Sequence, residues 1–250
     1  MQKPLVVKGL RKAYGGTIAV NALDIEVSSG EIFGLLGHNG AGKTTAIECI
    51  LGVKKRDGGS VELLGMHPET DRRTVFEKVG VQFQESHYQD KIRVSELCGV
   101  TASLFKHPAQ WQPLLKTFGL SGMEKRMVTE LSGGERQRLS VILALIPNPD
   151  IVFLDELTTG LDTKARRDVW KLLETLKKRG LTVLLTSHYM DEVEALCDRV
   201  CILKRGNAMI TGSISAVTAA SPCQTFEDAY LWFSGEEDGE HENISNVVME

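Results

Sequence analysis

The sequence has no long apolar run and no excess of positive charge, and both absences restrict what the protein can be. No stretch approaches the roughly 18 consecutive apolar residues of a membrane-spanning helix, and the opening MQKPLVVKGL lacks the apolar centre of a secretory signal. We therefore expect a soluble chain that serves a membrane process only through another polypeptide. The formal net charge is -4, so the lysine and arginine surplus typical of nucleic-acid-binding proteins is missing.

Cysteine is also scarce, with five residues in a chain of 250, at positions 49, 98, 197, 201 and 223. The chain is long enough to bury a real core, and an odd number of cysteines predicts reduced thiols in the cytoplasm. The spacing of Cys197 and Cys201 leaves a metal-binding or redox pair as an alternative. Because Cys201 falls in the strand-like run RVCIL, the pattern favours two packed thiols.

The first 30 residues alternate apolar and polar positions on both sides of a Tyr-Gly-Gly sequence, which predicts antiparallel strands. The pattern then changes. Residues 31–36, EIFGLL, have the continuous apolar character of a buried strand. The glycine-rich loop GHNGAGKTT follows at 37–45, and we expect a helix to start there and to end at Gly52.

Two further buried strands are predicted at 150–156, DIVFLDE, and at 181–188, LTVLLTSH. An amphipathic helix over 163–179 separates them and stops at Gly180. Its predicted inner stripe is Val169, Leu172, Leu173 and Leu176.

Between Glu85 and Glu130 the composition is typical of helices, which predicts a helical insertion into an α/β fold. The expected fold class is α/β, with an antiparallel β subdomain and an inserted α-helical subdomain. We predict one domain over 1–235, with core and antiparallel strands at 1–84 and 147–220, helical subdomain at 85–146, C-terminal helix at 222–235, and a loosely ordered acidic tail at 236–250.

The loop at 37–45 fits the pattern G-x-x-x-x-G-K-[ST] and lies between a buried strand and a helix. Its glycines let backbone N–H groups surround a phosphate, Lys43 supplies a positive charge, and the Thr44 hydroxyl can bind Mg²⁺. A glycine turn with a surface lysine is the alternative, which the strand–loop–helix context disfavours. The residues expected to bind the triphosphate are Gly37, His38, Asn39, Gly40, Ala41, Gly42, Lys43, Thr44 and Thr45.

Asp155 and Glu156 end the buried strand IVFL, at the sheet edge where ligands of open α/β sheets bind. We expect Asp155 to hold Mg²⁺ and Glu156 to act as general base on the attacking water. The alternative is a carboxylate pair that caps the following turn.

The motif LSGGERQRLS at 131–140 contains a capping box, in which Ser132 and Glu135 start a helix over about 133–145 with Leu139, Ile142 and Leu143 turned inward. The cap does not explain Gly133 and Gly134, since each glycine costs about 1 kcal/mol relative to alanine inside a helix. A helix N-terminus is a site for anions. We therefore expect Ser132, Gly133 and Gly134 to contact the γ-phosphate of an ATP held by a second copy of the domain.

These motifs occur in the order Tyr14, GHNGAGKTT, Gln84, LSGGERQ, IVFLDE, GLD and His188. With this spacing the chain resembles the ATP-binding subunit of ABC transporters, over roughly residues 3–235. The resemblance implies a P-loop NTPase (RecA-like) core with an antiparallel β subdomain and an inserted α-helical subdomain. The phosphate loop is shared with many nucleotide-binding proteins, whereas LSGGERQ ahead of an acid pair is nearly diagnostic of this family.

The resemblance implies that Tyr14 stacks on adenine, although a core or turn tyrosine is an alternative reading. It also implies a glutamine at the start of the helical insertion that contacts Mg²⁺ and the attacking water. The sequence VGVQFQE offers Gln82 and Gln84 for this role, and we choose Gln84 because it is the last before the break.

His188 resembles the histidine that binds the γ-phosphate and orients Glu156, and a surface or core histidine is the alternative. Asp162 resembles the aspartate that contacts the opposite subunit's phosphate loop, and it is also expected to cap the helix that follows. The resemblance thus implies as catalytic residues Lys43, Gln84, Glu156 and His188, and as Mg²⁺ ligands Thr44, Gln84 and Asp155.

Two positions depart from the family pattern. Leu157 stands where proline is usual, so the loop after the acid pair lacks a fixed φ angle. Arg93 stands where threonine is usual, two residues before Ser95. We expect altered loop rigidity without loss of activity, and a differently capped helical subdomain.

The resemblance implies cofactors ATP and Mg²⁺, a second nucleotide-binding subunit, permease partners, no nucleic acid, and a place on the cytoplasmic face of the membrane. The C-terminal FEDAYLWFSGE is similar to a terminal helix of bacterial exporter subunits for drugs, lipids or polysaccharides. Its apolar positions Phe226, Ala229, Tyr230 and Phe233 also suit ordinary packing. Two other functions remain: a soluble clamp in DNA repair, translation or iron–sulfur assembly, and a non-hydrolytic regulatory module.

Overall fold

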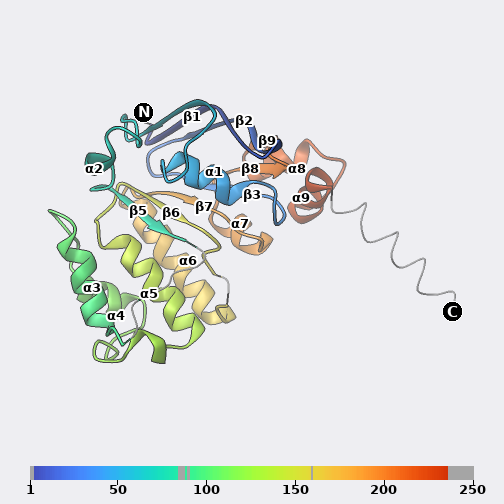
Figure 1. Ribbon diagram of the computed structural model, residues 1–250. Helices are drawn as coiled ribbons and strands as arrows, with labels where there is room; N and C mark the ends of the chain where they lie inside the picture. The colour runs from blue at the N-terminus through green and yellow to red at the C-terminus, as the bar shows by residue number, and fades with distance from the viewer. Residues whose placement is uncertain (1–2, 84–87, 89–90, 159, 236–250) are drawn as a thin grey trace, which may run out of the picture.

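The computed structural model describes residues 3–83, 88, 91–158 and 160–235 (Figure 1). Two β-sheets with helices between and beside them make up these residues. Within this part of the chain, no helix combines the length and the apolar character that crossing a membrane requires.

The smaller sheet is antiparallel and contains β2 (Thr17–Val27), β1 (Leu5–Tyr14) and β4 (Gly58–Leu63), in that order. Strands β1 and β2 are joined by Gly15 and Gly16, and Tyr14 pairs with Thr17. Both glycines have positive φ, 53° and 92°, as the tight turn of a two-residue hairpin requires. The antiparallel strands predicted from the N-terminal alternation are confirmed.

The larger sheet has six strands in the order β5-β6-β7-β3-β8-β9. The strands are β5 (Val79–Gln82), β6 (Ile151–Leu154), β7 (Thr182–Leu185), β3 (Ile32–Leu36), β8 (Arg199–Lys204) and β9 (Asn207–Gly212). The first five run parallel, and β9 pairs antiparallel with β8. The buried strands predicted at 31–36, 150–156 and 181–188 form adjacent strands of this sheet.

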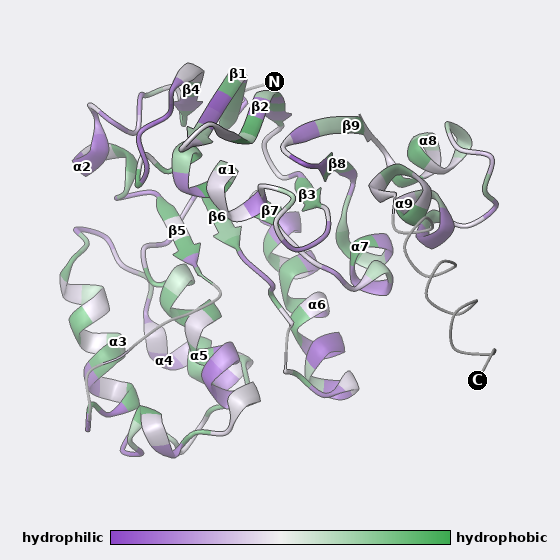
Figure 2. Cartoon of the chain, turned by 45° about the vertical axis from the view of Figure 1, so that its right-hand side comes forward, coloured by the Kyte–Doolittle hydropathy of each residue, from purple (hydrophilic) through white to green (hydrophobic). Residues whose placement is uncertain are grey.

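Alternate residues of these strands enter two separate cores, one on each face of the sheet. In β3, Ile32 and Leu36 belong to one core, whereas Phe33 and Leu35 belong to the other. Figure 2 shows β6 coloured as hydrophobic along its length, while the helices beside it carry both colours. Burial on both faces explains the continuous apolar runs in the sequence.

Helices cover both faces of the larger sheet (Figure 1). Helix α1 (Lys43–Ile50) lies between the two sheets, with Ala46 and Ile47 in the core that they share. The other core receives α5 (Gly133–Leu145), α6 (Thr163–Lys178), α7 (Met190–Leu196) and α9 (Phe226–Ser234).

Helix α6 follows its predicted pattern closely. Val169 and Leu173 are buried, and Leu172 and Leu176 are half-buried against the same core. Gly180 follows the helix end with φ 97°, a conformation that glycine adopts without strain. The predicted stripe and stop are therefore confirmed.

The segment between β5 and β6 is helical, with α3 (Val94–Ser103), α4 (Trp111–Thr117), a 3₁₀ turn (Val128–Glu130) and α5. Two short helices that sequence reasoning did not predict are α2 (Arg72–Val75) and α8 (Ile214–Ala219). At the start of α3, the Glu96 carboxylate accepts a hydrogen bond from the backbone N–H of Arg93 at 2.9 Å. That this start differs from the family pattern stays a prediction.

Cys197 and Cys201 are free, buried thiols on α7's end and on β8. Burial raises the pKa of both thiols, that of Cys201 to about 11, because the apolar surroundings disfavour the thiolate. The prediction of two packed thiols is confirmed.

In the same region Phe226, Ala229 and Tyr230 of α9 are buried, so this helix does pack on the core.

Candidate nucleotide-binding and hydrolysis site

The loop between β3 and α1 has a backbone that only glycine can adopt at two positions. Gly37 has φ 147° and Gly42 has φ 107°. A Cβ atom would lie 2.5 Å from the Leu203 carbonyl oxygen at Gly37, and 2.2 Å from the Ala19 carbonyl oxygen at Gly42. The glycines therefore let the loop turn tightly against its neighbours and present bare backbone at the N-terminus of α1, where anions are stabilised.

Lys43, the first residue of α1, folds its side chain back into this loop. Its Nζ donates to the carbonyl oxygens of Gly37 at 2.6 Å and His38 at 3.1 Å. The ammonium is thus held within the loop and is almost fully buried. A fixed positive charge within a loop of backbone amides suits the phosphates of a nucleotide.

Asp155 follows β6 directly and lies beside the start of α1. Its Oδ2 accepts from Thr44 Oγ1 at 3.5 Å, and its Oδ1 accepts from the Thr186 hydroxyl. The carboxyl is 3% exposed, and this burial raises its pKa, while the bond from Thr186 opposes the shift. A carboxylate next to a hydroxyl provides hard oxygen ligands of the type that Mg²⁺ prefers.

This pair fits the way in which Mg²⁺ is held beside nucleotides, with one or two protein oxygens and the rest supplied by phosphates and water. Within the described residues there is no group of three or more His, Cys, Asp or Glu side chains that could enclose a metal ion. The oxygens of Thr44 and Asp155 thus fit a nucleotide-bound cation.

Glu156 has a left-handed backbone, with φ 52°, which is unusual for a residue other than glycine and typical of functional sites. Its N–H donates to Thr186 Oγ1 at 3.0 Å, and its carbonyl accepts from Gln137 Nε2 at 3.2 Å. The carboxylate Oε1 lies 3.9 Å from Nδ1 of His188. The backbone of Glu156 is therefore fixed on both sides, and its carboxylate faces the histidine.

Tyr14 lies at the end of β1 with 44% of its surface exposed. The Nζ atoms of Lys12 and Lys54 are 5.2 Å and 5.6 Å from the centre of its ring. A core role is therefore wrong for this tyrosine. An accessible ring can stack on an aromatic base, and the two cations beside it can attract the phosphates of a nucleotide.

The predicted cap of α5 is confirmed. Ser132 Oγ accepts from the N–H of Glu135 at 3.2 Å, and the Glu135 carboxylate accepts from the N–H of Ser132 at 2.7 Å. A Cβ atom at Gly133 would meet nothing within 4 Å, whereas at Gly134 it would lie 3.3 Å from Leu161 Cδ2. Packing within the chain therefore does not require glycine at 133.

The tip of α5 lies on the other side of the larger sheet from the phosphate loop. Helix α5 packs on β5, β6, α3 and α4, whereas α1 packs under β1 and β2. As the first two residues of a helix, Gly133 and Gly134 have N–H groups without intrahelical partners. The phosphate loop and the LSGGERQ tip therefore belong to separate surfaces of one chain.

Asp162 caps α6, because its Oδ1 accepts from the N–H of Ala165 at 2.8 Å. The capping role is confirmed, and contact with an opposite subunit stays a prediction.

Gln84 lies outside the described residues. Gln82 is buried in β5, and its Nε2 donates to the carbonyl oxygen of Asp155 at 3.1 Å. Leu157, in the place of the usual proline, is fully buried.

Sequence reasoning did not single out Thr186 or Gln137, which fix the backbone of Glu156. A signal was present for both. Gln137 is the last residue of LSGGERQ, and Thr186 stands two residues before His188 at the end of a predicted strand.

A phosphate loop between a buried strand and a helix, with an acid pair at the end of a second strand of the same sheet, defines a P-loop nucleoside triphosphatase. Comparison with known proteins narrows this class. The family model of the ABC transporter matches residues 20–159. The chain belongs to this family, as an ATP-binding subunit, and the family hydrolyses ATP to power transport.

Two relatives and two solved structures illustrate the match. The chain is 38% identical over 219 residues to the Nod factor export ATP-binding protein I of Burkholderia orbicola, covering 86% of this chain and 72% of that protein. It is 40% identical over 206 residues to the protein of the same name from Rhizobium etli, covering 80% and 65%.

Among solved structures, an ATP-binding subunit of an ABC transporter superposes with a TM-score of 0.85 at 22% identity, covering 92% of this chain and 99% of that one. A nucleotide-free ATP-binding cassette gives a TM-score of 0.76 at 22% identity, covering 88% and 96%. At this level of identity the structures show the fold. ATP-binding domains of the family work as dimers with transmembrane permease subunits.

Proposed function

We propose that this chain dimerises head-to-tail around two MgATP and drives export through separate membrane subunits, from the cytoplasmic face of the membrane. The observation that carries the proposal is the separation of two complementary surfaces on one chain. The phosphate loop lies at the start of α1, and the tip at Ser132–Gly134 lies across the sheet with Gly133 facing open space. Neither surface completes the other within one chain.

In the proposed dimer, each ATP lies on the phosphate loop of one subunit and under the α5 tip of the other. The amides of Gly133 and Gly134 and the Ser132 hydroxyl contact the γ-phosphate, with the positive end of the helix dipole behind them. Asp162 contacts the opposite phosphate loop. Removal of the γ-phosphate by hydrolysis takes away a bridge between the subunits, and they part.

Within each site, Tyr14 stacks on adenine and residues 37–45 surround the phosphates. Thr44, Asp155 and Gln84 hold Mg²⁺, which, when bound, neutralises charge that develops on the phosphate oxygens. The proximity of Thr44 Oγ1 and Asp155 Oδ2, at 3.5 Å, supports this assignment.

Glu156 acts as the general base and takes the proton of the attacking water, while His188 binds the γ-phosphate and keeps the carboxylate of Glu156 oriented. The 3.9 Å separation of their side chains supports the pairing. Lys43 contributes its charge to the β- and γ-phosphates.

Contact with a permease is supported by two exposed apolar side chains at the C-terminal end of α3, one within the helix and one directly after it. Val100 is 56% exposed and Leu104 is 71% exposed, one helical turn apart. Export as the direction of transport is supported by the names of the relatives from Burkholderia and Rhizobium. The C-terminal sequence FEDAYLWFSGE, which is similar to a terminal helix of bacterial exporter subunits and forms α9, also supports this direction.

The decisive experiment uses Glu156→Gln in the full chain with MgATP. We expect unchanged ATP affinity, a stable dimer on size-exclusion chromatography that requires ATP, and no turnover. Lys43→Ala in the same background is the control, and it should remain monomeric because the nucleotide is not held. A Glu156→Gln chain that stays monomeric at saturating ATP, or that hydrolyses ATP at the wild-type rate, would refute the proposal.

Co-purification distinguishes transport from the alternative of a soluble clamp. We expect the native chain to co-purify with a protein of several membrane spans. Sedimentation with ribosomes, and no membrane protein in the purified complex, would favour the clamp.

A further inference from the structure

The side-chain amide of Gln137 bridges two consecutive carbonyl groups in the segment after β6. Its Nε2 donates to Glu156 O at 3.2 Å and to Leu157 O at 2.9 Å. An amide nitrogen carries two hydrogens, so both bonds can form at once. Gln137 lies in α5, five residues beyond Ser132. It therefore joins the helix that begins with the LSGGERQ tip to the backbone of Glu156.

The neighbouring backbone groups are held in a similar way from two other elements. Gln82 of β5 donates to the carbonyl oxygen of Asp155 at 3.1 Å, and Thr186 accepts from the N–H of Glu156 at 3.0 Å. Carbonyl groups 155, 156 and 157 thus each receive an N–H of a glutamine side chain. A left-handed residue such as Glu156 persists only where its surroundings fix it, and these bonds provide that constraint.

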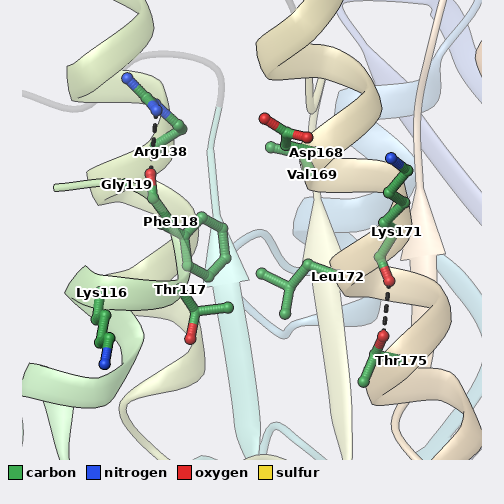
Figure 3. Close-up of a pocket in the computed structure, with 10 residues that line it drawn as sticks. All are labelled: Lys116, Thr117, Phe118, Gly119, Arg138, Asp168, Val169, Lys171, Leu172 and Thr175. Carbon is green, nitrogen blue, oxygen red and sulfur yellow. Dashed lines mark hydrogen bonds between the residues drawn. The ribbon is translucent and has the colours of Figure 1, made fainter.

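Elsewhere, the helical subdomain packs loosely against α6. An open cavity of about 380 Å³ separates them, with Phe118 and Arg138 on one side and Leu172 and Thr175 on the other. Figure 3 shows Phe118 and Leu172 pointing toward each other across it. Arg138 of α5 thus borders an open space, while Gln137, the residue before it, connects α5 to the catalytic segment.

We infer that Gln137 is a positioning residue for Glu156. When the α5 tip contacts a neighbour's nucleotide, Gln137 passes the resulting displacement of α5 to the backbone of Glu156, the general base. The inference rests on the proposed function and adds a route within it. From Ser132 to Gln137 the helix rises about 7.5 Å, a distance over which it moves as a rigid unit. Leucine leaves the φ angle free, unlike proline, and the bond from Gln137 fixes the carbonyl group of Leu157.

The test compares Gln137→Met, Gln137→Glu and Gln137→Lys in the full chain, with MgATP as substrate. Methionine and glutamate keep the length of the side chain but have no N–H donor. We expect an unchanged KM, unchanged ATP-dependent dimerisation in the Glu156→Gln background, and a kcat that falls by about 10- to 100-fold, since small displacements of a reacting group cost rates of this order. Lysine restores donors at similar reach and should recover activity.

Ser140→Ala is the matched control, because Ser140 lies on the same helix and bonds Tyr88 at 3.0 Å, away from Glu156. It should keep the wild-type kcat. A wild-type kcat in Gln137→Met would overturn the inference, and so would a loss of ATP-dependent dimerisation in that variant. An equal loss of kcat in Ser140→Ala would also overturn it. A wild-type chain that neither dimerises nor hydrolyses ATP would instead refute the proposed function, and the inference with it.

Discussion

The Oε1 atom of Glu156 lies 3.9 Å from Nδ1 of His188, at the ends of two adjacent parallel strands. The two side chains differ in exposure, 13% for the glutamate and 47% for the histidine. The carboxylate is therefore partly protected from water, while the imidazole is accessible to a ligand. This arrangement suits a base that is oriented by a group in contact with the substrate.

His188→Ala should lower kcat by about 10²- to 10⁴-fold, as is usual when a group that assists proton transfer is removed. ATP affinity should change little, because residues 37–45 still hold the phosphates. Steady-state kinetics together with titration of a fluorescent ATP analogue check this. A variant with unchanged kcat would exclude His188 from the reaction.

Thr186→Val should reduce both activity and stability, because Thr186 bonds the Asp155 carboxylate and the Glu156 N–H. Loss of these bonds costs about 1–3 kcal/mol of unfolding free energy. The matched control is Thr182→Val, at the start of the strand that Thr186 follows, where an equally buried hydroxyl accepts from the N–H of Gly30 at 3.1 Å. Urea unfolding should show similar losses of stability in both variants, but only Thr186→Val should lose ATPase activity. Equal activities would contradict the positioning role.

Gly133→Ala should fold normally, since the added Cβ meets nothing within 4 Å and alanine is the better helix former. It should nevertheless abolish ATP-dependent dimerisation, because the methyl group would occupy the surface proposed to contact the neighbour's phosphate. Gly99→Ala in α3 is the control, with equally open space around it and no effect expected on dimerisation. The measurement is size-exclusion chromatography of each variant in the Glu156→Gln background.

A dimer of normal stability with Gly133→Ala would show that the α5 tip does not contact the nucleotide. Thermal unfolding of the monomer keeps this outcome separate from misfolding.

Glu192 of α7 should make the stability of the fold depend on pH. The carboxyl is fully buried, and its Oε1 accepts from Trp170 Nε1 at 3.0 Å. Burial raises its pKa, and the bonds and the nearby positive charge of Arg166 oppose the shift without cancelling it. The folded state thus keeps the proton to higher pH than the unfolded state. The contribution of Glu192 to the free energy of unfolding is therefore fully present at low pH, and it is lost as the pH rises through the raised pKa of the folded state.

Glu192→Gln should remove this dependence and leave the chain at least as stable above neutral pH, because the amide is neutral throughout. Urea unfolding at several pH values tests the prediction. Glu194→Gln, at an exposed position of the same helix, is the control and should retain the wild-type slope. A slope unchanged by Glu192→Gln would contradict the assignment.

Local patterns in the sequence identified most of the fold. The strand at 31–36 could be predicted because its residues are apolar on both faces, and the start of α5 because Ser132 and Glu135 satisfy each other's N–H groups locally. The short helices α2 and α8 were missed because one or two turns are too short for a helical period to show.

Parts of the site could not be predicted for a different reason. Gln137 contacts residues 19 and 20 positions away, and this depends on how α5 docks beside β6. Gln82 presented the same difficulty. The sequence offered it as the alternative to Gln84, but did not place it against the Asp155 carbonyl. Such bonds follow from tertiary packing, which local periodicity does not encode.

The side chain of Lys43 closes the phosphate loop on itself, since its ammonium is bonded to the carbonyl oxygens of Gly37 and His38. An arriving nucleotide has to compete with these oxygens for the same cation. The free energy of nucleotide binding therefore depends on two sets of bonds, those that Lys43 breaks with the loop and those that it makes with the phosphates. The bonds that Lys43 gives up reduce the net free energy of nucleotide binding, which favours release of the nucleotide after hydrolysis.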